Sequence, residues 1–140
     1  MHRADIRRGH IVVPAGHGAT SFVDARDIAA VAALALVEPG HEGRAYALTG
    51  ADALDYYRVA EVFTETLGRA VTYANPTIPQ FVAQMRREGL APGLVLTMVG
   101  IYTTARLGLA AAVTDDVARL LGQPPIALRR FVADYRACWA

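Results

Sequence analysis

The sequence contains no lysine, because all 14 of its basic side chains are arginines. A Schiff-base lysine, a P-loop lysine and a tyrosine–lysine proton relay are therefore impossible within the chain. The acidic side chains number 13, and the formal net charge is +1. A charge so close to zero creates no strong field for nucleic acid or anionic lipid, so we expect neither as a partner.

Cysteine is almost absent as well. Cys138 is the only one in the sequence, which excludes an intramolecular disulfide. Because the sequence also begins without a charged and then apolar leader, we expect a cytoplasmic protein. The four histidines, at positions 2, 10, 17 and 41, are never three or four residues apart, so their spacing does not support a zinc site.

Charged residues make up only 19% of the chain, whereas hydrophobic residues make up 54%. This balance indicates an ordered globular protein and excludes a disordered one. The mean hydropathy of +0.25 is high for a domain of this size. We therefore expect part of the apolar surface to meet a partner or a ligand.

The stretch "GHIVVPAGHGATSFVD" predicts a β-hairpin. Its strands would be His10–Pro14 and Ala19–Asp24, and Gly16, His17 and Gly18 would form the turn. The two glycines do not form a phosphate loop, because a third glycine is missing and the turn joins strand to strand.

A helix is expected directly after this second strand. Asp24 is its predicted N-cap and Asp27 lies in its first turn. This spacing satisfies free backbone N–H groups, so we interpret both carboxylates as structural rather than as an acid–base pair. Further on, the patterns predict a strand at Arg44–Thr49, a helix capped by Asp55, a strand near Val71 and Tyr73, and helices over 79–89, 115–121 and 126–139.

Residues 90–113 are long and apolar enough to resemble a membrane span. Pro92, Gly93, Gly100, Gly108 and above all Arg106 argue against that interpretation. We predict a buried or interface pair of helices here, and no membrane as a partner.

Four segments carry a resemblance to a known family. In order along residues 9–137, they are "PAGHGATSFVDARDIAAVAALAL", "GRAYALTG", "YYRVAEVFTETLGRAVTYANPTIPQF" and "AAAVTDDVARLLGQPPIALRRFVADY". This ordered set resembles the C-terminal half of NmrA-like proteins, which are atypical short-chain dehydrogenases/reductases. In that family the front half is a Rossmann unit with a glycine-rich turn that binds NAD(P)H. No such unit is present in this sequence.

The resemblance implies an α/β or α+β fold, with residues 1–140 as a single domain. It would be a truncated Rossmann-like unit, with a small sheet that contains the hairpin and a mostly helical C-terminal lobe. Arg44–Thr49 would be the last strand of the sheet, and the helices from Ile78 to Leu109 would line the substrate cleft. No cofactor is expected unless a separate Rossmann half supplies the site for NAD(P)H.

Six residues are candidates for binding a substrate. Tyr102 has Met98 and Arg106 one helical turn away on either side, so a phenol, a thioether and a guanidinium share one face, which suits a flat ligand with polar edges. The alternative for Tyr102 is a core tyrosine whose hydroxyl bonds to the backbone, and the alternative for His17 is a solvated residue of the turn. The candidates are Phe81, Met85, Met98, Tyr102, Arg106 and His17.

The leading functional hypothesis is binding of a hydrophobic, aromatic or polyketide-like small molecule. An enzyme of this kind would be a cofactor-independent cyclase or isomerase. The alternatives are a non-catalytic regulatory or interaction module and one subunit of a split NAD(P)H-dependent oxidoreductase. Because strand 44–49 would have unpaired edges and the helix over 28–36 a bare face, we expect a homodimer or a Rossmann-bearing partner.

Overall fold

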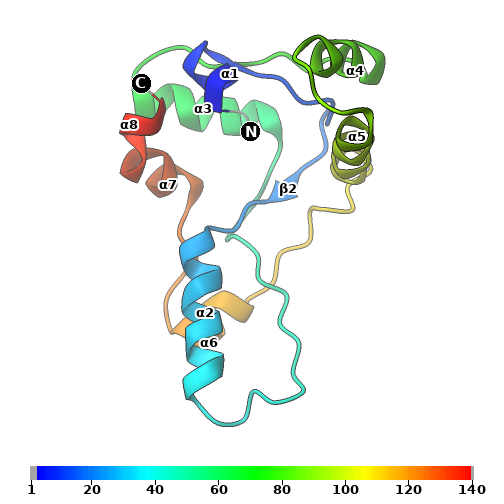
Figure 1. The fold of residues 1–140 in the computed structure, drawn as a ribbon. Coiled ribbons are helices and arrows are strands. Elements are labelled where there is room, and N and C mark those ends of the chain that lie inside the picture. Colours follow the sequence, from blue (N-terminus) through cyan, green and yellow to red (C-terminus); the bar gives the residue numbers. More distant parts are fainter. Residues whose placement is uncertain (1–2, 140) are drawn as a thin grey trace.

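The structure is a computed structural model that describes residues 3–139. Figure 1 shows helices α2 and α6 at one end of the molecule and α1, α3 and α8 at the other, while α4 and α5 form a pair at the side. The elements are α1 (Arg3–Arg7), β1 (His10–Ile11), β2 (Thr20–Ser21), α2 (Ala25–Val37), β3 (Ala53–Leu54), α3 (Tyr56–Leu67), β4 (Thr72–Tyr73), α4 (Ile78–Arg87), α5 (Pro92–Arg106), α6 (Asp116–Leu121), α7 (Leu128–Asp134) and α8 (Arg136–Trp139). The expected mixture of a small sheet and a helix-rich C-terminal part is confirmed.

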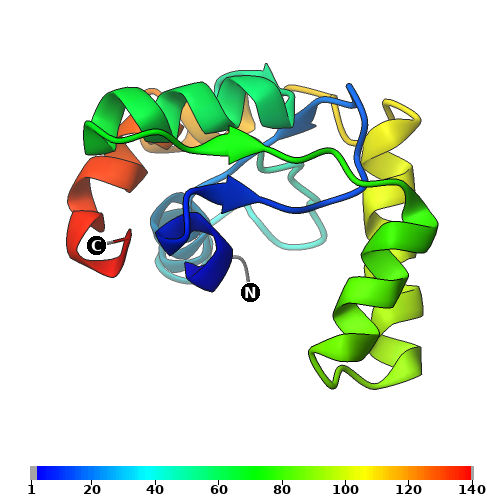
Figure 2. The same ribbon diagram turned by 90° about the horizontal axis from the view of Figure 1, so that it is seen from above.

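The strands pair differently from the predicted hairpin. β1 runs parallel to β4, with His10 opposite Thr72, and β2 runs antiparallel to β3, with Thr20 opposite Leu54. Figure 2 shows β1 and β4 side by side and pointing the same way. The hairpin of His10–Pro14 with Ala19–Asp24 is therefore wrong, because each segment finds its partner far along the chain.

The predicted strand Arg44–Thr49 is also wrong. This segment is irregular, and side chains rather than a neighbouring strand meet its polar groups. The backbone N–H of Ala47 donates to the Asp116 carboxylate at 2.8 Å, and the Thr114 hydroxyl donates to the Ala47 carbonyl oxygen. A strand needs a ladder partner, and residues 3–139 supply none at this segment.

The predicted helix caps are confirmed. The Asp24 side chain accepts from the backbone N–H of Arg26 at the start of α2, and the Asp55 side chain accepts from that of Arg58 at the start of α3. Gly68 ends α3 in the left-handed conformation, with φ 72°.

The apolar stretch 90–113 forms one helix, α5, which packs against α4. The predicted pair of helices within this stretch is wrong, because α5 ends at Arg106 and Gly108 turns the chain with φ 76°. Within residues 3–139, no helix is long and apolar enough to cross a membrane.

Helix α3 lies at the centre of the core. Its residues Val59, Val62 and Phe63 are buried. The helix packs against α7, where Val132 is fully buried, and against β4 next to the buried Val71. The same core extends to the facing sides of α4 and α5.

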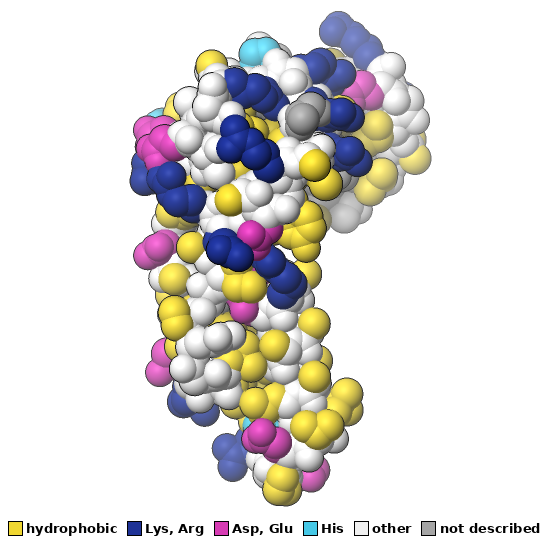
Figure 3. Space-filling model, turned by 90° about the vertical axis from the view of Figure 1, so that its left-hand side faces the viewer, with side chains coloured by type: hydrophobic (Ala, Val, Ile, Leu, Met, Phe, Trp, Pro, Cys, Tyr) yellow, Lys and Arg dark blue, Asp and Glu magenta, His cyan; other side chains and the backbone are white. Residues whose placement is uncertain are grey.

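Helix α2 is nearly bare. Among its 13 residues only Asp27 and Val31 are buried, although its sequence "ARDIAAVAALALV" is mostly apolar. Leu36 is 86% exposed and Val37 is 80% exposed. Figure 3 shows hydrophobic side chains over the lower part of the molecule, where α2 lies. A helix of this composition normally buries one face, so we infer that, within residues 3–139, α2 is covered only in part, by α6.

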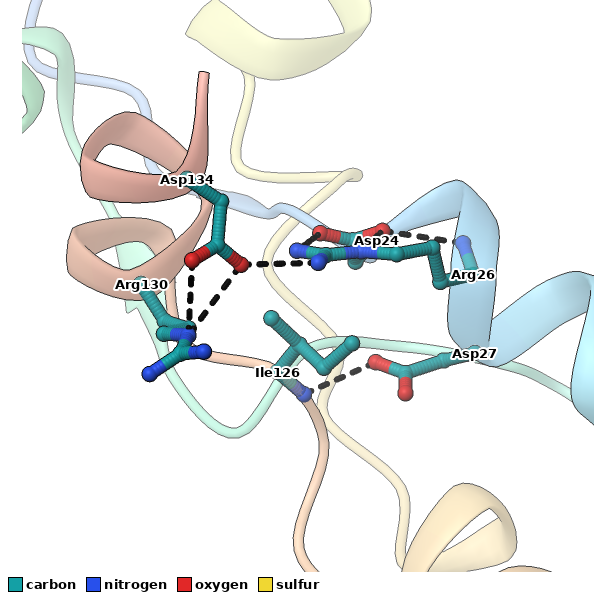
Figure 4. A network of polar contacts seen from close by, with 6 residues as sticks. All are labelled: Asp24, Arg26, Asp27, Ile126, Arg130 and Asp134. Carbon is teal, nitrogen blue, oxygen red and sulfur yellow. Dashed lines mark hydrogen bonds and ion pairs between the residues drawn. The ribbon is translucent and has the colours of Figure 1, made fainter. Parts of the chain in front are cut away.

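A polar network joins the start of α2 to α7 (Figure 4). Arg26 forms ion pairs with Asp24 at 2.8 Å and with Asp134 of α7 at 2.7 Å. Asp27 accepts a hydrogen bond of 2.8 Å from the backbone N–H of Ile126. The hydrogen bonds from Arg26 hold the pKa of the buried Asp24 carboxyl below its ordinary value. The network therefore anchors an otherwise poorly packed helix.

We predict that Asp24→Ala lowers the free energy of unfolding by about 1–2 kcal/mol, because α2 loses its N-cap. A carboxyl with a lowered folded-state pKa stabilises the protein above its unfolded pKa and loses that contribution as the pH falls through the folded pKa. The wild type should therefore lose stability as the pH falls from near 3.8, the ordinary pKa of Asp24, towards its lower folded value. Urea denaturation at several pH values measures both effects.

Asp24→Asn keeps a capping side chain but cannot ionise, so part of the acid-induced loss should disappear in this variant. Asp52→Asn, at an exposed turn position, is the control and should behave like the wild type. An unchanged stability in Asp24→Ala would contradict the anchoring role.

Candidate functional site

The first candidate region is an apolar hollow beside α3, with a volume of about 320 Å³. Its walls come from six elements and one loop, and an adjoining hollow of about 290 Å³ shares Phe22, Leu128 and Phe131 with it. We call the two together the Phe131 hollow. The larger one is lined by Arg3, Ile6, Ile11, Phe22, Tyr56, Val59, Phe63, Tyr102, Leu128, Phe131 and Trp139.

Aromatic side chains form much of the lining of this hollow. Phe22 and Tyr56 meet edge to face with their ring centroids 5.7 Å apart, and Phe63 and Trp139 do so at 5.2 Å. Burial raises the pKa of Tyr56 to about 12 and also raises that of Tyr102. Both phenols therefore stay protonated at neutral pH. Such a surface suits a flat apolar molecule or an apolar protein segment.

Most of the predicted substrate residues lie in the core. Phe81 is fully buried, and Met85 and Met98 are 5% and 2% exposed. None of these three lines the Phe131 hollow. Tyr102 lines the Phe131 hollow and meets Phe81 edge to face at 5.8 Å. Packing of α4 on α5 accounts for these side chains, and a role in binding stays a prediction.

The second candidate region is an open groove of about 460 Å³ between α3 and β4. We call it the α3–β4 groove. The buried Ala60 and Val71 lie along it, while the rings of Tyr57 and Tyr73 meet edge to face at 4.9 Å. It is lined by Tyr57, Ala60, Glu61, Thr64, Glu65, Val71, Thr72 and Tyr73.

A chain of hydrogen bonds fixes the two tyrosines of this groove. The Tyr73 hydroxyl donates to the Val13 carbonyl oxygen at 2.8 Å and accepts from the backbone N–H of Ala15 at 3.2 Å. The side-chain amide of Asn75 donates to the Tyr57 hydroxyl at 3.1 Å. Asn75 has φ 41°, the only positive φ of a non-glycine residue within 3–139. An asparagine tolerates this conformation better than most residues.

Two of the predicted site residues come together beside these tyrosines. The His17 ring stacks on Tyr57 with centroids 4.9 Å apart. The Arg106 side chain lies against Gly16, because a Cβ built there would be 3.5 Å from Cγ of Arg106. Burial raises the pKa of Tyr73, and the nearby charge of Arg106 partly offsets this effect. His17, a solvated turn residue by sequence, is thus also part of an aromatic contact.

Sequence reasoning missed Tyr57, Tyr73 and Asn75. Tyr57 is not followed by a lysine, so it does not match the tyrosine–lysine pair of reductases and carries no signal of its own. The available signal was the alternation of Tyr73 and Asn75 in "VTYANP", which puts both on one face of a strand. No local pattern indicates that Tyr57 meets them.

The starts of α2 and α3 and the turn at Gly18 are poorly suited to the pyrophosphate of a dinucleotide. At the starts of α2 and α3 one backbone N–H group already donates to the carboxylate of Asp24 or Asp55, and these negative charges disfavour a phosphate at either position. The turn at Gly18 is pressed against α5, since a Cβ there would come within 2.0 Å of the Ala105 carbonyl oxygen. Within residues 3–139 no cluster of His, Cys, Asp and Glu could hold a metal ion.

Comparison with known proteins finds no matching family model. The sequence is 36% identical over 140 residues to the NAD(P)H azoreductase of Xenophilus azovorans, covering 99% of this chain and 49% of that protein. It is 30% identical over 130 residues to quinone oxidoreductase 2 of Escherichia coli, covering 93% of this chain and 46% of that protein.

Solved structures give the same result. The NADPH-dependent quinone oxidoreductase from Escherichia coli superposes with a TM-score of 0.85 at 29% identity, over 95% of this chain and 48% of that chain. Triphenylmethane reductase from a Citrobacter species, complexed with NADP(H), superposes with a TM-score of 0.85 at 26% identity, over 95% of this chain and 46% of that chain. The relatives are NAD(P)H-dependent reductases, and the chain spans about half of their length.

The contact between the 16–18 turn and α5 is open to a direct test. We predict that Gly18→Ala destabilises the protein by about 2 kcal/mol, because the added methyl group collides with the backbone of Ala105. The displaced turn should also disturb the stacking of His17 on Tyr57, which the chemical shifts of the His17 ring protons report.

Gly100→Ala is the matched control. Gly100 lies within α5, and a Cβ there meets nothing within 4 Å. This variant should gain about 0.5 kcal/mol from reduced backbone entropy of the unfolded chain. Equal stability of the two variants would contradict the close contact at Gly18.

Proposed function

We propose that residues 1–140 form the substrate-covering half of an NAD(P)H-dependent oxidoreductase of the NmrA-like family. One observation carries the proposal: the chain aligns over 99% of its length with 49% of an NAD(P)H azoreductase. A dinucleotide-binding unit completes the enzyme, supplied by a further segment of the same protein or by another chain. The carboxylates at the starts of α2 and α3 disfavour a pyrophosphate there, which supports a separate dinucleotide-binding unit.

Three surfaces support docking of such a unit. The apolar face of α2 is bare, segment 44–49 has no ladder partner within residues 3–139, and the Phe131 hollow opens beside the start of α2. Addition of strands at 44–49 would satisfy backbone groups that now rely on side chains. The mean hydropathy of the chain fits the same picture, since surface that is apolar here becomes buried on docking.

The substrate that fits this proposal is a flat apolar compound. The Phe131 hollow offers aromatic edges and the neutral phenol of Tyr56 as the nearby polar group. The named relatives act on azo compounds, quinones and triphenylmethane dyes, which are all aromatic or conjugated. The oxidoreductase names of these relatives favour this function over the cofactor-independent cyclase or isomerase and over the regulatory module that the sequence also left open.

A chimeric enzyme tests the proposal. The part of the Xenophilus azovorans azoreductase that this chain does not span is fused ahead of residue 1. We expect the chimera to oxidise NADPH in the presence of menadione or an azo dye, measured by the loss of NADPH absorbance. A chimera that folds and binds NADPH but reduces neither these compounds nor a triphenylmethane dye would contradict the proposal.

Two variants of the chimera test whether turnover depends on the Phe131 hollow. Phe131→Glu places a charge in the hollow and should abolish turnover. Ala133→Glu adds the same charge at an exposed position of α7 and should leave turnover unchanged.

The isolated chain should not bind NADPH. Because Asp24 and Asp55 occupy the helix N-termini, titration calorimetry should detect no saturable binding. A dissociation constant on the order of micromolar would instead place the dinucleotide site within this chain.

The isolated chain should also pair with a second copy, because within residues 3–139 the packing of α6 leaves most of the apolar surface of α2 exposed. Light scattering should give about twice the mass of the chain. Leu36→Glu combined with Val37→Lys should yield a monomer, since both side chains lie on the bare end of α2. Leu107→Glu combined with Leu109→Lys, at equally exposed positions after α5, is the control and should remain a dimer. A well-dispersed wild-type monomer would contradict this pairing.

A further inference from the structure

The hydroxyl proton of Tyr57 has no acceptor among the described residues. Its oxygen accepts from the Asn75 amide, whereas the Tyr73 hydroxyl is engaged by Val13 and Ala15. The Tyr73 hydroxyl is thus already hydrogen-bonded within the protein, whereas the Tyr57 hydroxyl is held in place by Asn75 and can still donate. Because Tyr57 lines the α3–β4 groove, its proton is available to an acceptor oxygen within the groove.

The surroundings of Tyr57 favour an oxygen acceptor at this end. His17 stacks on its ring, and the Arg106 guanidinium lies beside the neighbouring Tyr73. Within residues 3–139, no carboxylate pairs with Arg106. Arg106 does not line the groove itself, but its positive charge raises the electrostatic potential at this end, which favours a ligand oxygen with partial negative charge.

The other end of the groove offers acceptors. Glu61 and Glu65 follow Tyr57 at successive turns of α3, roughly 6 and 12 Å further along the helix. Arg58 binds one oxygen of Glu61 at 2.7 Å, and Arg129 and Arg58 pair with Glu65. Their charges are thus compensated, but each carboxylate can still accept a hydrogen bond from a ligand hydroxyl or amine.

We propose that the α3–β4 groove binds a planar compound of one or two rings. A carbonyl oxygen of the ligand accepts from the Tyr57 hydroxyl, and a hydroxyl or amino group at its opposite end donates to Glu61. The rings lie over Ala60 and Val71 and against Tyr73. The groove volume of about 460 Å³ is in the range of small-molecule sites. This site is separate from the Phe131 hollow and does not depend on docking of a dinucleotide-binding unit.

Umbelliferone, a hydroxycoumarin, is a suitable probe because its carbonyl and hydroxyl groups lie at opposite ends of two fused rings. Its fluorescence anisotropy, titrated with the isolated chain, reports binding. Tyr57→Phe removes only the hydroxyl and should weaken binding roughly five- to tenfold, the effect of one hydrogen bond. The melting temperature should be nearly unchanged, since the residue is 38% exposed.

Tyr135→Phe is the matched control, because Tyr135 is a tyrosine of similar exposure, 40%, on the C-cap of α7. It should bind umbelliferone like the wild type. Glu61→Ala should weaken binding of umbelliferone but not of coumarin, which lacks the hydroxyl group.

Equal affinity of the wild type and Tyr57→Phe would overturn the proposal, as would the absence of saturable binding up to the solubility limit of the probe. A chimera that fails to oxidise NADPH would leave this result untouched, because the titration uses the isolated chain. The two proposals can therefore fail separately.

Discussion

The parallel pairing of β1 with β4 is the constraint on which both candidate regions depend. It joins residues 10–11 to residues 72–73, and the Tyr73 hydroxyl extends the connection to Val13 and Ala15. The segment between β1 and β2 is therefore held against the end of α5, where Gly18 permits close contact with the backbone of Ala105. Without this pairing, His17 would not reach Tyr57, and the α3–β4 groove would lose its end wall.

Helix α3 gives the molecule two chemically different surfaces. Successive residues of a helix point about 100° apart, so Tyr56 faces the Phe131 hollow while Tyr57 faces the α3–β4 groove. One phenol lies among apolar side chains with a pKa raised to about 12, and the other lies at an open rim beside an amide. The same helix thus serves an apolar surface that suits docking and a polar groove that suits a small ligand.

Local signals in the sequence were sufficient for several helix ends but not for the sheet, nor for the break between α7 and α8 within the helix predicted over 126–139. Asp24, Asp55 and Gly68 mark helix ends because capping involves residues only a few positions apart. Strand pairing joins residues that lie 34 positions apart, as Thr20 and Leu54 do, or 62 apart, as His10 and Thr72 do. The glycines near His17 resemble a hairpin turn, but they serve close packing. The helical spacing of Phe81, Met85 and Met98 is equally typical of a core face and of a cleft, so sequence alone did not separate the two. The structure brings Arg106 and His17 close to the same pair of tyrosines, an arrangement that only tertiary packing reveals, and their role in binding stays a prediction.

The exposed apolar face of α2 has a consequence for the stability and abundance of the protein in a cell. The Arg26 network, the buried Val31 and the contact with α6 hold α2 in place, and we expect this helix to open more often than the core around α3 and its amide protons to exchange sooner. Whatever covers α2 adds its own binding free energy to folding, by mass action. The abundance of this chain is then coupled to that of its cover, because an uncovered copy exposes a segment that proteases cut and chaperones retain.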